Sequence, residues 1–267
     1  MQNGPFIKER AMPGIIQDIC RAREIGFRAF SDDWVLKLEK AGQIRWVVGY
    51  KFDLNMSAAA ELAQDKVATY MALDAAGVRA IEHYLIRGLL QDATQWHIHI
   101  PELHDGPVVL KPLSGTGGHD VERYGSVSEA VEVAQHSGEL AWAVSPYYEV
   151  TAEYRLLMLG GQLLLSLEKT QPVQHGGLKL FNLGQGAVAA DISDKALLGE
   201  LQDMAGQVMR ALSLRLAAVD IVRTDDGELR VLEVNDGIML ENYALQSAGY
   251  KDRATAVYDA VVTALFS

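Results

Sequence analysis

The sequence has 267 residues, a single cysteine and no long apolar run. Cys20 alone cannot form an intrachain disulfide, which fits a reducing cytoplasm. The densest apolar stretch, residues 156–167, is interrupted by Gly160, Gly161 and Gln162, so we expect no membrane-spanning helix. The first 14 residues lack the apolar core of a signal peptide. These absences predict a soluble, cytoplasmic protein.

Several catalytic signatures are also missing. The sequence has no Gly-Lys-Ser/Thr, which excludes a Walker A loop, and no Gly-x-Gly-x-x-Gly spacing. It has no Gly-x-Ser-x-Gly, and Cys20 lies on an apolar helix face, so nucleophilic hydrolysis has no support. His97 and His99 share one side of a predicted strand, as in a zinc site, but no third ligand is evident. A polar strand face is the simpler interpretation.

Acidic residues outnumber basic ones, 35 to 24, and give a formal net charge of −11. This charge argues against general affinity for nucleic acid or anionic membranes, so a bound polyphosphate would need clustered lysines and arginines. A hydrophobic content of 49% suits a substantial core in one large domain or two tightly associated ones.

Apolar periodicity predicts a mixture of helices and strands. Helices are expected over residues 13–27, 57–76, about 193–214 and 254–266, and an S-x-x-E capping box at Ser126 and Glu129 begins another. Strands are expected over residues 42–50 (buried), 108–113, 141–145, 153–159, 163–168, 217–223 and 228–234. Because several of these strands follow one another through short turns, we predict an α+β fold with antiparallel pairs.

Residues 217–235 predict a β-hairpin. Asp226-Gly227 suits a two-residue turn, because both residues tolerate the positive φ of a type I′ turn. That turn places Asp220 directly opposite Glu233, with Asn235 on the same side of the pleat. The other face carries Val219, Ile221, Leu232 and Val234, which suits a core.

Directly opposed carboxylates repel each other, so Asp220 and Glu233 require compensation. A hard divalent cation provides it, and magnesium takes most of its remaining ligands from water and substrate phosphates. Asp220, Glu233 and Asn235 are therefore candidate magnesium ligands. A solvated strand face on which the acids happen to align is the alternative.

A second hairpin turns at Gly160-Gly161. This turn would place Met158, Leu156 and Tyr154 opposite Leu163, Leu165 and Leu167 on an apolar face. On the other face Glu153 would lie opposite Glu168, and Arg155 opposite Ser166. A glutamate here could bind a ribose hydroxyl, and Arg155 could bind phosphate with two parallel hydrogen bonds. Alternatively, Arg155 neutralises Glu168.

Lys111 lies near the end of a predicted strand that leads into Ser114-Gly115-Thr116-Gly117-Gly118. Glycines let backbone N–H groups approach phosphate oxygens, and the lysine adds positive charge. Lys66 lies on a helix face of small and apolar residues, while Lys169 and Lys179 flank a loop that reaches Asn182, Gly184 and Gly186. Each lysine alone is more often solvated. Together with the two acidic hairpins, they indicate a nucleotide site.

The ordered set of motifs resembles the ATP-grasp superfamily, particularly its ribosomal-protein glutamate ligase and glutathione synthetase branch. The motifs are Asp65-Lys66, Lys111 with its glycine-rich loop, Glu153-Tyr154-Arg155, Asn182-x-Gly184-x-Gly186, Asp220 and Leu232-Glu233-Val234-Asn235. The likeness covers about residues 51–243. It implies an ATP-grasp fold in which two α+β subdomains with antiparallel sheets clasp ATP. We expect a short N-terminal α/β segment (residues 1–55), a lid-side subdomain (56–145) and a C-terminal subdomain with the magnesium site (146–267).

The resemblance also implies a role for each site residue. Lys66 and Lys111 would hold the α- and β-phosphates beneath Ser114, Gly115, Gly117 and Gly118, with Lys179 also in the nucleotide site. Adenine would lie against the backbone of Pro146, Tyr147 and Tyr148, and Glu153 would bind the ribose. Arg155, Lys169 and Asn182 would line the γ-phosphate as the catalytic residues. Asp220, Glu233 and Asn235 would bind magnesium, with two ions expected and Mn²⁺ able to substitute.

The function implied is an ATP-dependent carboxylate–amine ligase that works through an acyl phosphate. Expected substrates are a small carboxylate and an amine, or a peptide, with no nucleic acid or membrane partner; a homodimer is compatible. The alternatives are a kinase on the same scaffold and a nucleotide-binding protein without turnover. Against the last stands the complete set of magnesium ligands and Arg155.

Three departures from the family pattern concern the substrate and the hinge. Asp236-Gly237-Ile238-Met239 replaces a small residue followed by Pro-Gly, and Ser145 replaces the usual acidic or amide residue before the hinge. The region before Lys66 is also shorter than the customary N-terminal domain.

Overall fold

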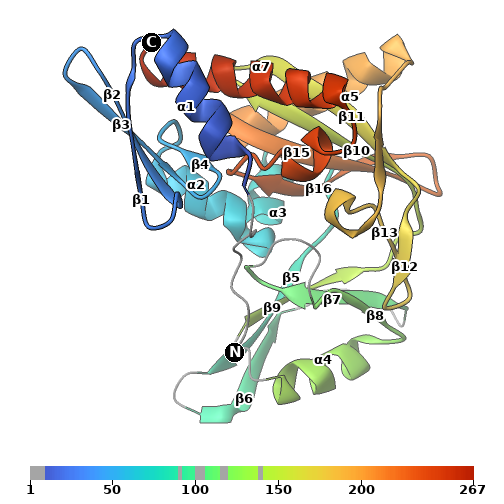
Figure 1. Ribbon diagram of the computed structural model, residues 1–267. Helices are drawn as coiled ribbons and strands as arrows, with labels where there is room; N and C mark the ends of the chain where they lie inside the picture. The colour runs from blue at the N-terminus through green and yellow to red at the C-terminus, as the bar shows by residue number, and fades with distance from the viewer. Residues whose placement is uncertain (1–9, 90–91, 100–105, 115–119, 138–140) are drawn as a thin grey trace. The chain divides into compact units, whose positions relative to one another are not determined.

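The computed structural model describes residues 10–89, 92–99, 106–114, 120–137 and 141–267 (Figure 1). The chain forms two compact units. Unit 1 combines both ends of the chain, Met1–Met56 and Gly237–Ser267, and unit 2 is Ser57–Asp236. The expected division at residues 55 and 145 stays a prediction.

Unit 1 combines helices with a four-stranded antiparallel sheet of order β1-β2-β3-β4. Its elements are α1 (Met12–Ala22), β1 (Gly26–Phe30), β2 (Val35–Lys40), β3 (Gln43–Val48), β4 (Lys51–Phe52), α6 (Glu241–Ala244) and α7 (Ala248–Leu265). The buried Glu241 carboxylate accepts hydrogen bonds from the backbone N–H groups of Ala11 (3.0 Å) and Met12 (3.1 Å). It thereby satisfies donors that a helix N-terminus leaves without partners.

The prediction of a buried strand over residues 42–50 is wrong for most of β3. Val47 is buried, but Ile44, Trp46 and Val48 are 41–46% exposed. Successive side chains of a strand point to opposite faces, so only one face of this sheet contributes to the core. An apolar run does not show which of its faces lies outside.

Unit 2 contains two five-stranded sheets and a two-stranded ribbon. The larger sheet has the order β14-β11-β10-β15-β16, the smaller sheet β6-β5-β9-β7-β8, and the ribbon is β12-β13. The larger sheet comprises β10 (Val150–Leu159), β11 (Gln162–Thr170), β14 (Val188–Ala190), β15 (Leu216–Thr224) and β16 (Leu229–Asn235). The smaller sheet comprises β5 (Tyr84–Leu89), β6 (Asp92–His99), β7 (Val108–Pro112), β8 (Glu122–Tyr124) and β9 (Ala141–Pro146), and the ribbon comprises β12 (Val173–His175) and β13 (Leu178–Leu180).

Each large sheet of unit 2 has its own apolar core. Helix α5 (Lys195–Ala211) packs on the larger sheet, where Leu201, Val208, Leu156 and Val219 are fully buried. Helix α4 (Val127–His136) packs on the smaller sheet. Ser126 Oγ accepts from Glu129 N (3.3 Å) as the capping box predicts, whereas the Glu129 carboxylate accepts from Gly125 N (2.8 Å).

The helix expected over residues 57–76 is two helices, α2 (Ser57–Gln64) and α3 (Lys66–Ala75). The break lies at Asp65, whose extended backbone lets its carboxylate accept hydrogen bonds from Val67 N and Ala68 N, both at 2.9 Å. An Asp side chain at this position favours a helix start over continuation. The cap fixes Lys66 as the first residue of α3.

The other helix predictions are confirmed in type and adjusted in extent. Helix α5 is slightly shorter than residues 193–214, and α7 begins at Ala248 after the N-cap Ser247, six residues before the expected start. Within the described residues, no helix combines the length and apolarity needed to cross a membrane.

The β15–β16 hairpin places Asp220 opposite Glu233, as predicted. Its turn is not the predicted two-residue turn, because Thr224 N donates to Glu228 O (3.0 Å) around the three residues 225–227. Gly227 occupies the position with positive φ (86°), as three-residue hairpin loops require. A β-bulge then shifts the register between Asp220 and Ile221, so Ile221 pairs with Val231 and Leu232 is the extra residue.

The β10–β11 hairpin turns at Gly160-Gly161 as predicted, and Met158 pairs with Leu163. Beyond the turn a bulge shifts the register by one residue. Glu153 therefore pairs with Lys169 and not with Glu168, and Arg155 pairs with Leu167 and not with Ser166. On its other side β10 pairs with β15, which places Arg155 beside Asp220.

Candidate functional site

The smaller sheet of unit 2 has one face toward α4 and a second face with buried polar side chains. Val108, Leu110, Trp142 and Val144 belong to the core under α4. Alternation places Lys111 and Ser145 on the second face, where they are 8% and 2% exposed. Lys111 on β7 pairs with Ala143 on β9, close to the start of the glycine-rich loop.

Lys111 is a buried cation without a counterion in contact. Its ammonium makes no hydrogen bond or ion pair with another residue of the described chain. Burial lowers the pKa of Lys111 to about 8; Glu233 partly offsets this effect, and the Lys66 charge adds to it. A charge held this way is destabilising until an anion approaches it.

Lys66, at the start of α3, lies beside Lys111. Its Nζ donates to the carbonyl oxygens of Pro112 (3.0 Å) and Leu113 (3.4 Å), which precede the glycine-rich loop. Burial lowers the pKa of Lys66 as well. Two ammonium groups and the first residues of the loop thus converge, as the sequence predicted.

Arg155 and Asp220 form a two-pronged ion pair across β10 and β15. Arg155 Nε lies 2.7 Å from Asp220 Oδ1, and its terminal nitrogen lies 2.5 Å from Oδ2. Asp220 is fully buried, and burial raises its pKa, but Arg155 and Lys169 outweigh burial and hold that pKa well below its usual range. The proposed partnership of Arg155 with Glu168 is wrong because the bulge in β11 moves Glu168 out of register.

Lys169 joins the two acidic strands. Its Nζ forms a buried ion pair with Glu153 and lies 3.2 Å from Asp220 Oδ1. Burial raises the pKa of Glu153, although the Lys169 charge opposes that effect. The register that pairs Glu153 with Lys169 therefore removes the repulsion that a Glu153–Glu168 pair would have produced.

The three predicted magnesium ligands lie together. Asn235 Nδ2 donates to Glu233 Oε1 at 3.1 Å, and the Glu233 side chain is 37% exposed while Asp220 is buried. Two carboxylates and an amide are hard oxygen donors, which fit magnesium. Among the described residues no three His, Cys, Asp or Glu side chains gather as a metal site, so an ion here would depend on Asn235 as well.

The repulsion that first suggested a metal is already relieved by protein cations. Arg155 and Lys169 both contact Asp220, and Arg155 lies 3.9 Å from Glu233 Oε1. The opposed acids therefore do not by themselves require a metal ion. The metal-binding role of the three residues stays a prediction.

Comparison with known proteins gives this arrangement a family. Residues 110–257, more than half of the chain, match the model of an ATP-grasp domain, family 3 of its clade. The chain belongs to this ATP-grasp family. No curated relative matches the sequence.

Solved structures of ATP-grasp ligases share the fold. A D-alanine–D-alanine ligase from Bacillus anthracis complexed with ATP superposes with a TM-score of 0.58 at 16% identity, over 79% of this chain and 70% of that one. A D-cycloserine synthetase gives 0.52 at 20% identity, over 75% and 71%. An L-amino acid ligase from Bacillus licheniformis gives 0.51 at 16% identity, over 68% of this chain and 42% of that one. The predicted superfamily and its α+β fold are confirmed, whereas the suspected branch stays a prediction.

The expected hinge of the ATP-grasp fold follows β9. Tyr147 N donates to Pro107 O (2.9 Å), so this amide is not free for a base. Arg123 lies over the Tyr147 ring at 4.1 Å, and the Tyr148 hydroxyl donates to Glu82 (2.8 Å). These contacts fix the segment that joins the smaller sheet to β10.

Four predicted residues of this ATP-grasp site lie at its edge or outside the description. Asn182 caps a short 3-10 helix (Leu183–Gln185) with Oδ1, which accepts from Gly184 N at 2.8 Å. Lys179 forms an ion pair with Glu149 next to the hinge and is 42% exposed. Ser114 is exposed at the start of the loop. Gly115, Gly117 and Gly118 lie outside the described residues, as do the side chains of His97 and His99.

His83 is a buried residue of the site that sequence reasoning missed. It is 3% exposed and lines a pocket with Lys66 and Glu233. The segment 78–83 before β5 has neither apolar periodicity nor a motif, so no sequence signal marked it.

Proposed function

We propose that this ATP-grasp protein is an ATP- and magnesium-dependent ligase that joins a carboxylate to an amine through an acyl phosphate. The observation that carries the proposal is the buried Lys111 ammonium, which has no anionic contact in the described chain and lies beside Lys66. A chain with net charge −11 does not bury uncompensated cations together without a use for them.

The charges of the site favour a polyanionic ligand. Four cations (Lys66, Lys111, Arg155 and Lys169) surround three carboxylates (Glu153, Asp220 and Glu233). The two lysines near the glycine-rich loop would hold the α- and β-phosphates, and Arg155 and Lys169 would face the γ-phosphate. For Glu153 to bind a ribose hydroxyl, its carboxylate would share its hydrogen-bonding capacity with Lys169.

The chemistry begins with transfer of the γ-phosphoryl group to a carboxylate oxygen, which yields an acyl phosphate and ADP. The amine nitrogen then attacks the carbonyl carbon and loses a proton, and inorganic phosphate leaves as the amide forms. Arg155 and Lys169 are placed to stabilise charge on the transferred group, and positioning provides most of the remaining rate enhancement. Magnesium held by Glu233, Asn235 and Asp220 would neutralise triphosphate charge.

Support for a ligase over a kinase comes from the fold. The D-alanine–D-alanine ligase and the L-amino acid ligase that share it form amide bonds, as their names state. At 16% identity this likeness concerns architecture, so the carboxylate and amine must be found by experiment.

The test is ATP consumption against pools of amino acids and short peptides, with mass spectrometry of the products. An amide-linked product that requires both a carboxylate and an amine supports the ligase. A phosphorylated product formed without an amine would replace it with a kinase. Nucleotide binding without turnover in any pool would favour a regulatory nucleotide-binding protein.

A further inference from the structure

His83 carries a hydrogen-bond acceptor that the protein leaves without a partner. Its Nδ1 lies 2.9 Å from Ile81 O, and a carbonyl oxygen only accepts, so Nδ1 carries the proton. The opposite nitrogen, Nε2, is then a lone-pair acceptor. This atom is buried and has no hydrogen-bond partner within the described chain. A buried polar atom of this kind requires an explanation, because leaving it unpaired is destabilising.

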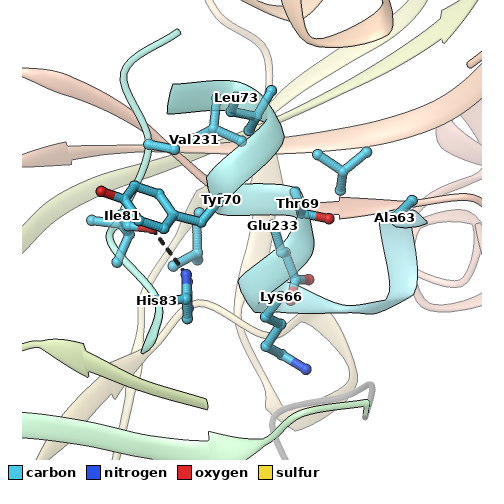
Figure 2. A pocket seen from close by; sticks show the side chains of 12 residues that line it. Ala63, Lys66, Thr69, Tyr70, Leu73, Ile81, His83, Val231 and Glu233 are labelled. Atoms are coloured by element: carbon cyan, nitrogen blue, oxygen red, sulfur yellow. Dashed lines mark hydrogen bonds between the residues drawn. The ribbon is translucent and has the colours of Figure 1, made fainter. Parts of the chain in front are cut away.

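The pocket around His83 has about 290 Å³ of space outside atoms, part of it open to solvent. This volume is close to the lower end of the range for small-molecule sites. Figure 2 shows His83 with Lys66, Tyr70 and Glu233 around the same space, and the dashed line marks the bond to Ile81. Apolar side chains of Leu73, Ala80, Val231 and Leu232 form much of the remaining wall.

The charges nearby keep the His83 ring neutral. Burial, and then the Lys111 and Lys66 charges, lower the pKa of His83 well below its usual value, although the bond to Ile81 opposes this. A neutral ring with its proton on Nδ1 cannot donate from Nε2. The group that binds there therefore carries an N–H or O–H donor and is not a phosphate oxygen.

The position of His83 in the sheet separates it from the phosphate-binding end. Tyr84, the next residue, pairs with Val144 on β9, and β9 ends at Pro146 where the hinge begins. Lys111 pairs with Ala143 toward the other end of β9, near the glycine-rich loop. His83 thus lies at the hinge end of the face, where a nucleobase would lie if Lys111 binds phosphates.

We propose that His83 Nε2 accepts a hydrogen bond from the exocyclic amino group of adenine and thereby selects adenine over 6-oxopurine nucleotides. The inference rests on the proposed function, because it assumes that a nucleotide occupies the site. In a 6-oxopurine the carbonyl oxygen replaces the amino group and places an acceptor against an acceptor. A site built around a buried hydrogen bond discriminates strongly against a ligand that cannot form it.

Binding of diphosphates by isothermal titration calorimetry, in the presence of magnesium, tests the proposal. The probes are ADP, purine riboside 5′-diphosphate (which lacks the amino group) and inosine 5′-diphosphate. Wild-type protein should bind ADP about tenfold more tightly than purine riboside diphosphate, a ratio typical of one buried hydrogen bond. His83→Phe keeps a planar ring and removes the acceptor, so ADP affinity should fall to that of purine riboside diphosphate, whose own affinity stays unchanged.

Tyr70→Phe is the matched control, because it alters the same pocket without touching the proposed acceptor. It should preserve the preference for ADP. Equal weakening of both diphosphates by His83→Phe would overturn the proposal and indicate a structural role or a buried water on Nε2. Equal affinity of wild-type protein for ADP and purine riboside diphosphate would also overturn it, while leaving the proposed function intact.

A second measurement uses only the wild-type protein. In ¹⁵N-labelled histidine spectra, the Nε2 signal of His83 should shift on addition of ADP and stay in place on addition of purine riboside diphosphate. Identical responses to both would contradict the assignment even if His83→Phe failed to fold. If neither diphosphate binds at all, the proposed function itself fails, and this inference fails with it.

Discussion

Replacing Lys111 with methionine should stabilise the ligand-free protein while weakening nucleotide binding. Methionine has a similar length and no charge, so it can occupy the same buried position without desolvating an ammonium. Lys111 is 8% exposed, and no residue of the described chain forms an ion pair with it. The residue proposed to bind phosphate is thus also a source of instability.

The size and pH dependence of this effect follow from the pKa of Lys111. Burial lowers that pKa from 10.5 to about 8 in the folded protein. Below pH 8 both folded and unfolded chains hold the proton, and the folded chain is less stable by about 3 kcal/mol, since one pKa unit corresponds to about 1.4 kcal/mol. Between about pH 8 and pH 10.5 only the unfolded chain keeps the proton, so wild-type stability rises with pH as this cost disappears.

Urea unfolding of wild-type and Lys111→Met proteins at about pH 7 and pH 10 measures the difference, and calorimetry measures ADP affinity. We expect the variant to gain up to about 3 kcal/mol at neutral pH and much less at the higher pH. Lys179→Met is the control, because Lys179 is 42% exposed and its pair with Glu149 should contribute less than about 1 kcal/mol. A Lys111→Met protein less stable than wild type at pH 7 would refute the reasoning.

Three further substitutions test other parts of the site. Glu233→Ala should abolish turnover with an unchanged circular dichroism spectrum, because it removes a proposed metal ligand; retained turnover would count against that role. Arg155→Met leaves the fully buried Asp220 with one cation fewer and should lower the unfolding free energy in urea by about 3–5 kcal/mol. Arg155→Lys should lose clearly less, and equal losses would show that charge is unimportant there. Asp65→Ala removes the cap of α3 and should cost about 1 kcal/mol in thermal unfolding, whereas Asp65→Asn should retain most of it.

Turn residues made the registers of both hairpins partly predictable. Gly160 and Gly161 both adopt positive φ, and the pairing nearest this turn follows from them. The bulges were not predictable, because the extra residues, Leu164 and Leu232, are leucines in apolar strands and leave no mark in the sequence. A bulge depends on how two strands twist against each other and their neighbours.

The opposition of Asp220 and Glu233 was predicted correctly although its stated basis was incomplete. The actual loop is one residue longer than the predicted turn, and the bulge beyond it restores the expected register at Asp220. In the β10–β11 hairpin a single bulge had no such compensation, so the partner of Glu153 was predicted wrongly.

The members of the site could be collected from motif order, but their pairing could not. Lys66, Lys111, Arg155 and Glu233 converge as the resemblance implied. That Arg155 lies beside Asp220 depends on β10 pairing with β15, residues about 65 positions apart, which no local pattern encodes. His83 was invisible for a related reason: its importance lies in an unpaired nitrogen, which is a property of the fold and not of the residue type.

The fork between Arg155 and Asp220 makes the resting site a poor receptor for simple anions. An anion that draws the guanidinium away leaves a fully buried carboxylate with less neutralisation, a loss that offsets what the anion gains. A ligand that arrives with its own cation, as a metal-bound nucleotide does, can satisfy both halves of the fork at once. Cellular phosphate and free carboxylates, present in large excess, are thereby kept from occupying the same arginine.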